Sequence, residues 1–313
     1  MRTGTLAGCT VGQVARLAVL AAALLAAAAT AGAVDVFILK SAETPAWRPT
    51  IDALRRVGTA HNFTEFDLRN DKAEGARVAA TLKGRTAVLV AMGSLAAQAV
   101  RETVPEMPLV FCMVADPARL NLAGPGIGGV AFTVPAKNQL AAFRLVNPRG
   151  VRVGVIYTEQ GAGAVVQDAI KSASSVRLSL VARPVTSLKD VPGALRSILQ
   201  GPEAVDAVWI PPDPVLMDAE LRRFLLSETA KAGKPVYAST GTMVSEGALV
   251  SNGPDFASIG ELAGELVNRL ASGEKGRLEM LVPRGELVIN KKMASKLGID
   301  VSADALKAAN KTF

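Results

Sequence analysis

The stretch Asn147-Pro-Arg-Gly-Val-Arg-Val-Gly-Val-Ile-Tyr157 decides the fold, because the chain breaks there and then starts its pattern again. Proline and glycine end the preceding helical segment, and an apolar strand opens directly after them. Apolar strands alternate with helices of about 10 to 15 residues both before and after the break. Such alternation predicts parallel sheets. The restart predicts two similar lobes, each an α/β unit with its own sheet, rather than one long sheet.

Polar loops follow most of the predicted strands. Before the break, strands are predicted at 34–39, 63–66, 86–91, 109–113 and 127–132, and after it at 151–157, 178–182, 205–210 and 236–238. The loops that stand out begin at Lys40, Met92, Ala115, Thr158 and Pro211. Ligands bind beyond the carboxyl ends of strands in open parallel sheets. If the two sheets face each other, these loops surround one cleft that suits a small molecule.

The overall composition fits an α/β protein and argues against nucleic-acid binding. The 313 residues suit one large domain or two of ordinary size, and half of them are apolar. The formal net charge is +7, but no run of Lys and Arg is interleaved with aromatic residues. We interpret the basic residues as a solvated surface.

The first 33 residues have the order of a secretory signal peptide. Arg2 and Arg16 supply positive charge, 17–29 is an apolar core, and Ala31-Gly-Ala33 is a small-x-small cleavage site. Cleavage near Ala33 would give a periplasmic protein. The alternative is a retained anchor helix, because the uncharged run 17–34 approaches the length of a membrane span.

The sequence contains no recognisable catalytic or metal-binding set. His61 is the only histidine, and Cys112 would be the only cysteine left after cleavage. The glycines at 124–129 match a dinucleotide-binding pattern but lead into a strand, whereas that fingerprint opens a helix. We therefore expect no enzyme activity, no metal and no cofactor. An α/β enzyme that uses Asp116 and Asp213 is the weakest hypothesis.

Two aspartates are candidates for ligand binding. Asp213 follows an aliphatic strand between Pro212 and Pro214, and Asp116 follows another strand and precedes Pro117. A rigid carboxylate at a strand end can accept a hydrogen bond from a ligand ammonium. The alternative for each is a helix cap or a turn-forming role.

The other candidates are hydroxyl side chains in the same kind of loop. Ser94 precedes a helix, where capping and ligand binding are compatible. Tyr157 ends the strand that opens the second half, where it either walls the cleft or packs against the sheet. The predicted ligand-binding residues are Ser41, Ser94, Asp116, Tyr157, Thr158, Asp213, Ser239 and Thr240.

Several motifs in order resemble the substrate-binding proteins of ABC transporters, in particular the group that includes tryptophan- and tyrosine-binding proteins. The best marks are Pro108-Leu-Val-Phe-Cys-Met-Val-Ala-Asp-Pro117, Gly154-Val-Ile-Tyr157, Val208-Trp-Ile-Pro-Pro-Asp213, Glu246-Gly-Ala-Leu249 and the segment 286–299. The resemblance covers about 34–309. It implies a type I periplasmic-binding fold, with two Rossmann-like lobes joined by a three-segment hinge.

The resemblance also implies lobe boundaries, a function and partners. Lobe 1 would comprise 34–146 and 249–274, and lobe 2 would comprise 147–248 and 275–313. The protein would be a monomeric, extracytoplasmic solute-binding protein that captures an amino acid or related solute and delivers it to an ABC permease. The alternative is a periplasmic sensor of the same fold that signals to a membrane kinase or cyclase.

Some polar positions of the family are replaced in this chain. Ala115 stands where the family has Thr in a Thr-Asp-Pro motif. After Tyr157, the family often has Asn-Pro-x-Glu-x-Asn-Ser, and this chain has Thr158-Glu-Gln-Gly-Ala-Gly-Ala164. The usual acidic stretch after the strand at 236–238 reads Ser239-Thr-Gly-Thr242. The identity of the ligand therefore stays open.

Overall fold

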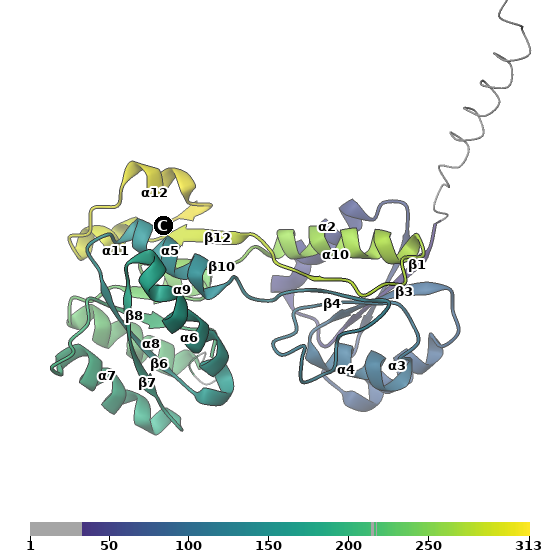
Figure 1. The fold of residues 1–313 in the computed structure, drawn as a ribbon, viewed down its shortest axis with the longest axis horizontal. Helices are drawn as coiled ribbons and strands as arrows, with labels where there is room; N and C mark the ends of the chain where they lie inside the picture. Colours follow the sequence, from purple (N-terminus) through teal and green to yellow (C-terminus); the bar gives the residue numbers. More distant parts are fainter. Residues whose placement is uncertain (1–32, 214–215, 217) are drawn as a thin grey trace, which may run out of the picture.

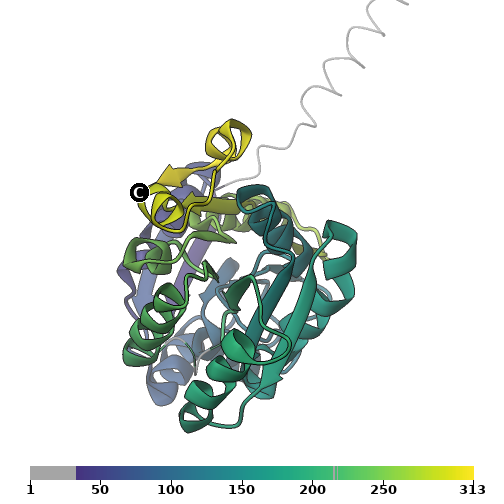
Figure 2. The same cartoon turned by 90° about the vertical axis from the view of Figure 1, so that its left-hand side faces the viewer.

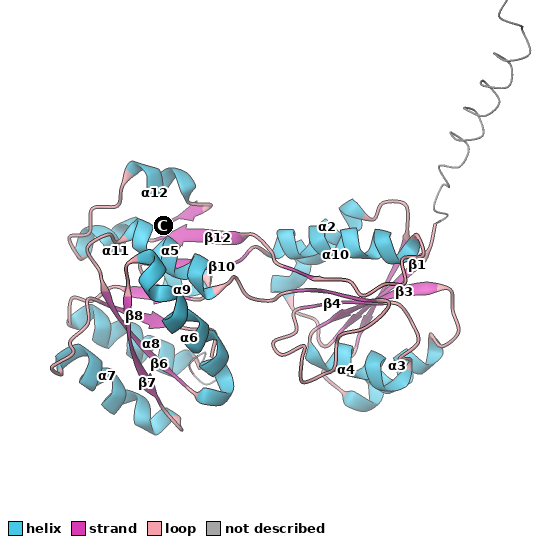
Figure 3. Ribbon diagram, viewed as in Figure 1, coloured by secondary structure: helices cyan, strands magenta, loops and turns pink. Residues whose placement is uncertain are grey.

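The computed structural model describes residues 33–213, 216 and 218–313. It consists of two α/β lobes side by side (Figure 1). Strands run between layers of helices in each lobe (Figure 3), and Figure 2 looks onto the second lobe. The predicted signal peptide lies outside the described residues, apart from Ala33. None of the helices among the described residues is long and apolar enough to span a membrane.

Lobe 1 is built on a six-stranded parallel sheet with the order β11-β5-β4-β3-β1-β2. Helices α2 and α10 bury their apolar sides on one face of this sheet, and α3 and α4 cover the other. The strands are β1 (Asp35–Lys40), β2 (Asn62–Asp67), β3 (Ala87–Met92), β4 (Leu109–Cys112), β5 (Ile127–Val130) and β11 (Met280–Leu281). The helices are the 3₁₀ turn η1 (Pro45–Trp47), α2 (Arg48–Val57), α3 (Lys72–Thr81), α4 (Ser94–Thr103) and α10 (Phe256–Ala271).

Lobe 2 is built on a seven-stranded sheet with the order β13-β12-β10-β9-β8-β6-β7, in which only the β10–β12 pair is antiparallel. The strands are β6 (Arg152–Tyr157), β7 (Ser179–Pro184), β8 (Ala207–Ile210), β9 (Val236–Ala238), β10 (Val250–Pro254), β12 (Gly285–Ile289) and β13 (Lys311–Thr312). The helices are α5 (Ala136–Val146), α6 (Glu159–Ala173), η2 (Ser174–Val176), η3 (Leu188–Asp190), α7 (Val191–Gln200), α8 (Ala219–Lys231), α9 (Gly241–Glu246), α11 (Lys291–Lys296) and α12 (Ala303–Ala308).

The first five strands of each lobe have the same spatial order. Lobe 1 reads β2-β1-β3-β4-β5, and lobe 2 reads β7-β6-β8-β9-β10. In this topology the strand order reverses between the first and third strands, and ligands bind beyond the strand ends at that switch point. The prediction of two similar, mostly parallel α/β lobes is therefore confirmed.

The crossings between lobes lie elsewhere than the sequence suggested. Segments 131–135, 255 and 282–284 connect the lobes, rather than positions near 147, 249 and 275. Helix α5 packs in the core of lobe 2, where the ring of Phe143 stacks on that of Tyr237 with centroids 4.7 Å apart. The Asn147 break ends α5 but does not mark a crossing, because the apolar side of this helix fits the second sheet. Strand β10 pairs with β9 and β12 and therefore belongs to lobe 2, so the second crossing follows this strand and does not lie near 249.

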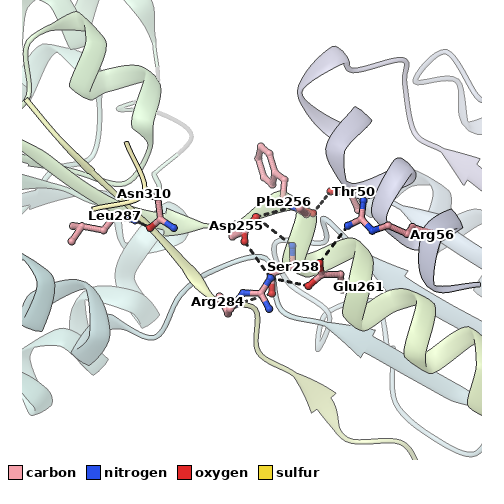
Figure 4. Close-up of polar contacts among 10 residues, drawn as sticks. Thr50, Arg56, Asp255, Phe256, Ser258, Glu261, Arg284, Leu287 and Asn310 are labelled. Atoms are coloured by element: carbon pink, nitrogen blue, oxygen red, sulfur yellow. Dashed lines mark hydrogen bonds and ion pairs between the residues drawn. The ribbon is translucent and has the colours of Figure 1, made fainter. Parts of the chain in front are cut away.

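The second and third crossings are fastened to each other (Figure 4). Asp255 N donates to Arg284 O at 2.9 Å, and Arg284 N donates to Ser258 Oγ at 3.1 Å. The Arg284 guanidinium lies 2.7 Å from Glu261 and 3.6 Å from Asp255. Because Ser258 and Glu261 belong to α10, these contacts tie both crossings to lobe 1.

Candidate ligand-binding site

A cleft of about 630 Å³ lies between the lobes and is lined by residues of both. Ala115 follows β4, Pro212 follows β8 and Ser239 follows β9. The cleft therefore lies at the carboxyl ends of strands in both lobes. Its lining also includes Ala46, Thr133, Val134, Gly161, Val165, Gly241, Gly253, Pro254 and Val288.

Two phenylalanines form an aromatic wall of the cleft. Phe132 lies in the first crossing, and Phe256 opens α10 directly after the second. Their rings are nearly parallel, at 4°, with centroids 6.5 Å apart. This wall joins two of the three segments about which the lobes would move, and it offers an apolar surface to a ligand ring.

Two buried polar atoms of the lining have no hydrogen-bond partner within the described chain. They are Ser239 Oγ and Gln139 Oε1, on side chains that are 5% and 3% exposed. A buried polar group without a partner costs about 1–3 kcal/mol. A ligand that hydrogen-bonds to these atoms removes that cost. Thr240 and Thr242 add exposed hydroxyls beside Ser239.

The cleft also carries one acidic and one basic side chain. Glu286 lies on β12 and Lys311 on β13, and Val288 of β12 pairs with Lys311. Because side chains alternate along a strand, Glu286 and Val288 share one face of the sheet. Neither charge enters an ion pair within the described chain, and Lys311 Nζ lies 4.7 Å from the ring centroid of Phe313.

Ser41 stabilises the loop after β1, at the switch point of lobe 1. Its buried Oγ accepts a hydrogen bond from Ala96 N, in the first turn of α4, at 3.0 Å. Gly93 lies against it: a Cβ at this position would be 2.5 Å from Ser41 Oγ, and φ is +92°. Ser94 begins α4 and is exposed, and it does not line the cleft.

Asp213 fastens the switch point of lobe 2. Its side chain is fully buried, and Oδ2 accepts from Thr158 N at 2.6 Å and from Thr158 Oγ1 at 2.9 Å. Thr158 Oγ1 in turn accepts from Gly161 N at 3.1 Å and so caps α6. The structure therefore brings two predicted site residues together, with the carboxylate turned to the loop backbone.

The remaining predicted residues differ in their access to the cleft. Tyr157 is buried and donates to Glu159 Oε1 at 2.9 Å; burial and this hydrogen bond raise the pKa of its phenol. Asp116 is exposed and accepts from Arg119 N at 3.0 Å, which is the turn-forming arrangement. Among the predicted residues, Ser239 and Thr240 line the cleft, and Asp116 and Asp213 each adjoin a lining residue.

Sequence reasoning missed several lining residues. Phe132 is the last residue of the predicted strand 127–132, and the rule that located the other loops could have found it. Gln139 and Phe256 come from α5 and α10, the helices that follow two of the crossings. Glu286 and Lys311 come from strands β12 and β13 at the edge of lobe 2. Their nearness depends on how distant segments pair, which no local pattern encodes.

The described residues offer no metal-binding cluster and no histidine in the cleft. They contain no group of three or more His, Cys, Asp or Glu side chains that could hold a metal ion. His61 Nε2 lies 2.9 Å from Asn268 Oδ1, and His61 does not line the cleft. Cys112 is buried in the lobe 1 core, where desolvation raises the pKa of its thiol to about 12. A thiol in this state is a poor nucleophile.

Comparison with known proteins identifies similar chains. The family model described as ABC transporter substrate binding protein matches residues 33–313. A protein of Clostridioides difficile strain R20291 named tyrosine-binding protein is 24% identical over 232 residues, which cover 70% of this chain. The match spans 66% of that relative's own length, just under two thirds.

Solved structures share the fold. An ABC domain from Streptococcus pneumonia in complex with L-Trp has a TM-score of 0.66 at 21% identity, covering 90% of this chain and all of that one. The ligand-free, open structure of a substrate-binding protein with adhesive properties from Clostridium difficile has a TM-score of 0.76 at 19% identity, covering 89% and 98%. These likenesses confirm the type I periplasmic-binding fold, and the higher score belongs to the open form.

Proposed function

Because the chain belongs to the ABC transporter substrate-binding protein family, we propose that it captures an amino acid or a related organic solute between its two lobes. The observation that carries this proposal is the cleft lined by both lobes. Hinge closure around a ligand is driven by contacts that form only in the closed state. The tyrosine and tryptophan named for two relatives make aromatic amino acids the first candidates.

The charged end of such a ligand would meet lobe 2. Glu286 is suited to the ligand ammonium, and Lys311 is suited to its carboxylate, since neither has an ion-pair partner within the described chain. Ser239 and Thr240 would add hydrogen bonds to the same end. An aromatic ring would then lie towards the Phe132–Phe256 wall.

The other predicted residues would act on the loops or on the closed state. We assign Ser41, Thr158 and Asp213 to holding the loops in shape, since each is buried and hydrogen-bonded there. Ser94 and Asp116 lie exposed beyond the strand ends of lobe 1 and would reach the ligand only on closure.

Export and delivery to a permease complete the proposal. The leader 1–33 would direct the chain to the periplasm and be cleaved near Ala33, and the mature protein would act as a monomer. Pull-down of the mature protein with the membrane components of its gene neighbourhood tests delivery. Retention by a permease supports transport, and retention only by a kinase or cyclase ectodomain assigns the protein to sensing.

A ligand screen tests the binding function directly. At one hundred times its dissociation constant, a ligand that binds only the folded state adds about 2.7 kcal/mol to the free energy of unfolding. We expect a thermal shift with at least one aromatic amino acid in a panel of amino acids, nucleosides and organic acids. A panel without any shift contradicts solute capture.

Two serines provide a matched test of where that ligand binds. Ser239 and Ser251 are both buried, and both hydroxyls lack a partner within the described chain, but only Ser239 lines the cleft. We expect Ser239→Ala to weaken binding about tenfold, as loss of one hydrogen bond does, and Ser251→Ala to leave it unchanged. Equal effects in isothermal titration calorimetry would contradict this site.

A further inference from the structure

The side-chain amide of Gln139 has a fixed orientation at the edge of the cleft. Gln139 lies in the first turn and a half of α5 and is 3% exposed. Its Nε2 donates to Val134 O, in the first crossing, at 2.8 Å. An amide oxygen in the place of Nε2 could not donate to that carbonyl, so this hydrogen bond distinguishes the nitrogen of the amide from its oxygen. Oε1 is therefore the remaining acceptor.

That acceptor has no donor within the described chain. Buried polar atoms in folded proteins nearly always have a hydrogen-bond partner, and each exception needs an explanation. Trp209 Nε1 and Ser251 Oγ are exceptions inside lobe 2 that do not line the cleft. Gln139 does line it. Its position points to a donor that the ligand supplies.

Gln139 lines a different part of the cleft from Glu286 and Lys311. Helix α5 packs on the face of the lobe 2 sheet that carries Leu287 and Ile289. Val288 belongs to the core cluster of the other face, and Glu286 shares its side of the strand. The partner of Gln139, Val134, is two residues from Phe132 of the aromatic wall. A ligand whose charged end lies at Glu286 and Lys311 would therefore present a different end to Gln139.

We propose that Gln139 Oε1 accepts a hydrogen bond from a donor on the ring of the ligand, and that the cleft thereby selects rings with an N–H or O–H group. This inference rests on the proposed function. Among aromatic amino acids, the phenol of tyrosine and the indole of tryptophan carry such a donor, and phenylalanine does not. A site built to hydrogen-bond a substrate group rejects the analogue that lacks it, because its own polar atom is then left unpaired.

Titration calorimetry with two ligand pairs tests the proposal on the full chain. The pairs are tyrosine with phenylalanine, and tryptophan with 1-methyltryptophan, which lacks the ring N–H. We expect the donor-bearing member of each pair to bind at least about tenfold more tightly. In Gln139→Met, which keeps the length of the side chain without its acceptor, we expect the two members to bind almost equally.

Two further variants separate this role from general damage to the cleft. Ser239→Ala should weaken the binding of both members of a pair and preserve their ratio, because the proposed function assigns Ser239 to the charged end of the ligand. Burial without a charged partner favours the protonated carboxyl, so Gln139→Glu can still donate to Val134 O and offer an acceptor oxygen of the same reach, and it should keep the preference for the donor. Gln139→Glu also keeps the proposal testable if Gln139→Met does not fold.

Each outcome bears on the proposal. If the unaltered protein binds both members of each pair equally, the proposal is overturned. It is also overturned if Gln139→Met still prefers the donor-bearing member of each pair. In both cases the proposed capture of amino acids still stands. Binding of none of the four ligands, but of another solute, overturns the inference and the aromatic ligand class together. Binding of no solute at all contradicts the proposed function itself.

Discussion

A hydroxyl side chain directly follows the first strand of each lobe: Ser41 after β1 and Thr158 after β6. In lobe 1, Ser41 accepts from the backbone of α4, so a neutral hydrogen bond joins the two loops of the switch point. In lobe 2, Thr158 donates to Asp213 through both its N–H and its hydroxyl, so a buried carboxylate joins the corresponding loops.

The difference shows that one topology can hold its ligand-facing loops with two kinds of bond. A hydrogen bond to a charged group contributes about 1.5–3 kcal/mol, and a neutral one about 1 kcal/mol. Lobe 2 therefore depends on its joining residue more than lobe 1 does. A carboxylate at a strand end looked like a ligand group in the sequence, yet Asp213 is completely buried among loop atoms.

The largest effect should come from removing that carboxylate. Asp213→Ala leaves the N–H and hydroxyl of Thr158 without their acceptor in a buried loop, and we expect a loss of about 3 kcal/mol in the free energy of unfolding. Urea unfolding followed by circular dichroism measures it. Asp116→Ala is the matched control in lobe 1, since Asp116 is exposed and accepts one backbone bond; its cost should be about 0.5 kcal/mol. Equal losses would contradict the structural assignment of Asp213.

A smaller effect compares the two hydroxyls themselves. Thr158→Ala removes one bond to Asp213 and the cap of α6, so we expect a loss of about 2 kcal/mol. Ser41→Ala removes one bond to Ala96 N, and we expect about 1 kcal/mol. The same unfolding experiment ranks them. If Ser41→Ala proves the costlier variant, the two switch points do not differ as their bonding indicates.

The fold was largely predictable because its signals are local. Continuous apolar runs identified β1, β3 and β6, and the predicted strand at 236–238 coincides with β9 (Val236–Ala238). Parallel strands end at the same edge of a sheet, so the polar loops after these strands could be placed together at that edge. Alternation of strands and helices then determined the class of fold.

The lobe boundaries and part of the site were not predictable from local pattern. Helix α5 ends at a proline–glycine break, so it looked like the end of a lobe, yet its apolar side packs on the second sheet. Gln139 and Phe256 reach the cleft only because the chain crosses between lobes next to each of them. The same limit applies to Asp213: the sequence indicates a carboxylate at a strand end, but not which neighbour it bonds.

The smallest effect concerns the last residue of each first strand, Lys40 in lobe 1 and Tyr157 in lobe 2. Burial lowers the pKa of Lys40, but its bonds to Glu43 and Glu65 outweigh this and raise the pKa overall. Burial and then Glu159 raise the pKa of Tyr157. Both groups hold their protons more tightly in the folded state. Their contributions are thus complete below the ordinary pKa values, near 10, and are lost as the pH rises through the folded values.

Tyr157→Phe should therefore reduce the decrease in the free energy of unfolding at alkaline pH. At neutral pH it removes one hydrogen bond to an exposed carboxylate, and we expect a cost below about 1 kcal/mol. Above about pH 10 the free energy of unfolding should fall less steeply than in the unaltered protein, because the phenylalanine has no proton to lose. The buried Tyr237 and Cys112, whose pKa values are also raised by burial, are present in both chains and cancel in the difference. If the unfolding free energies of the two chains stay parallel from about pH 8 to 11, the phenol of Tyr157 does not hold its proton more tightly in the folded state.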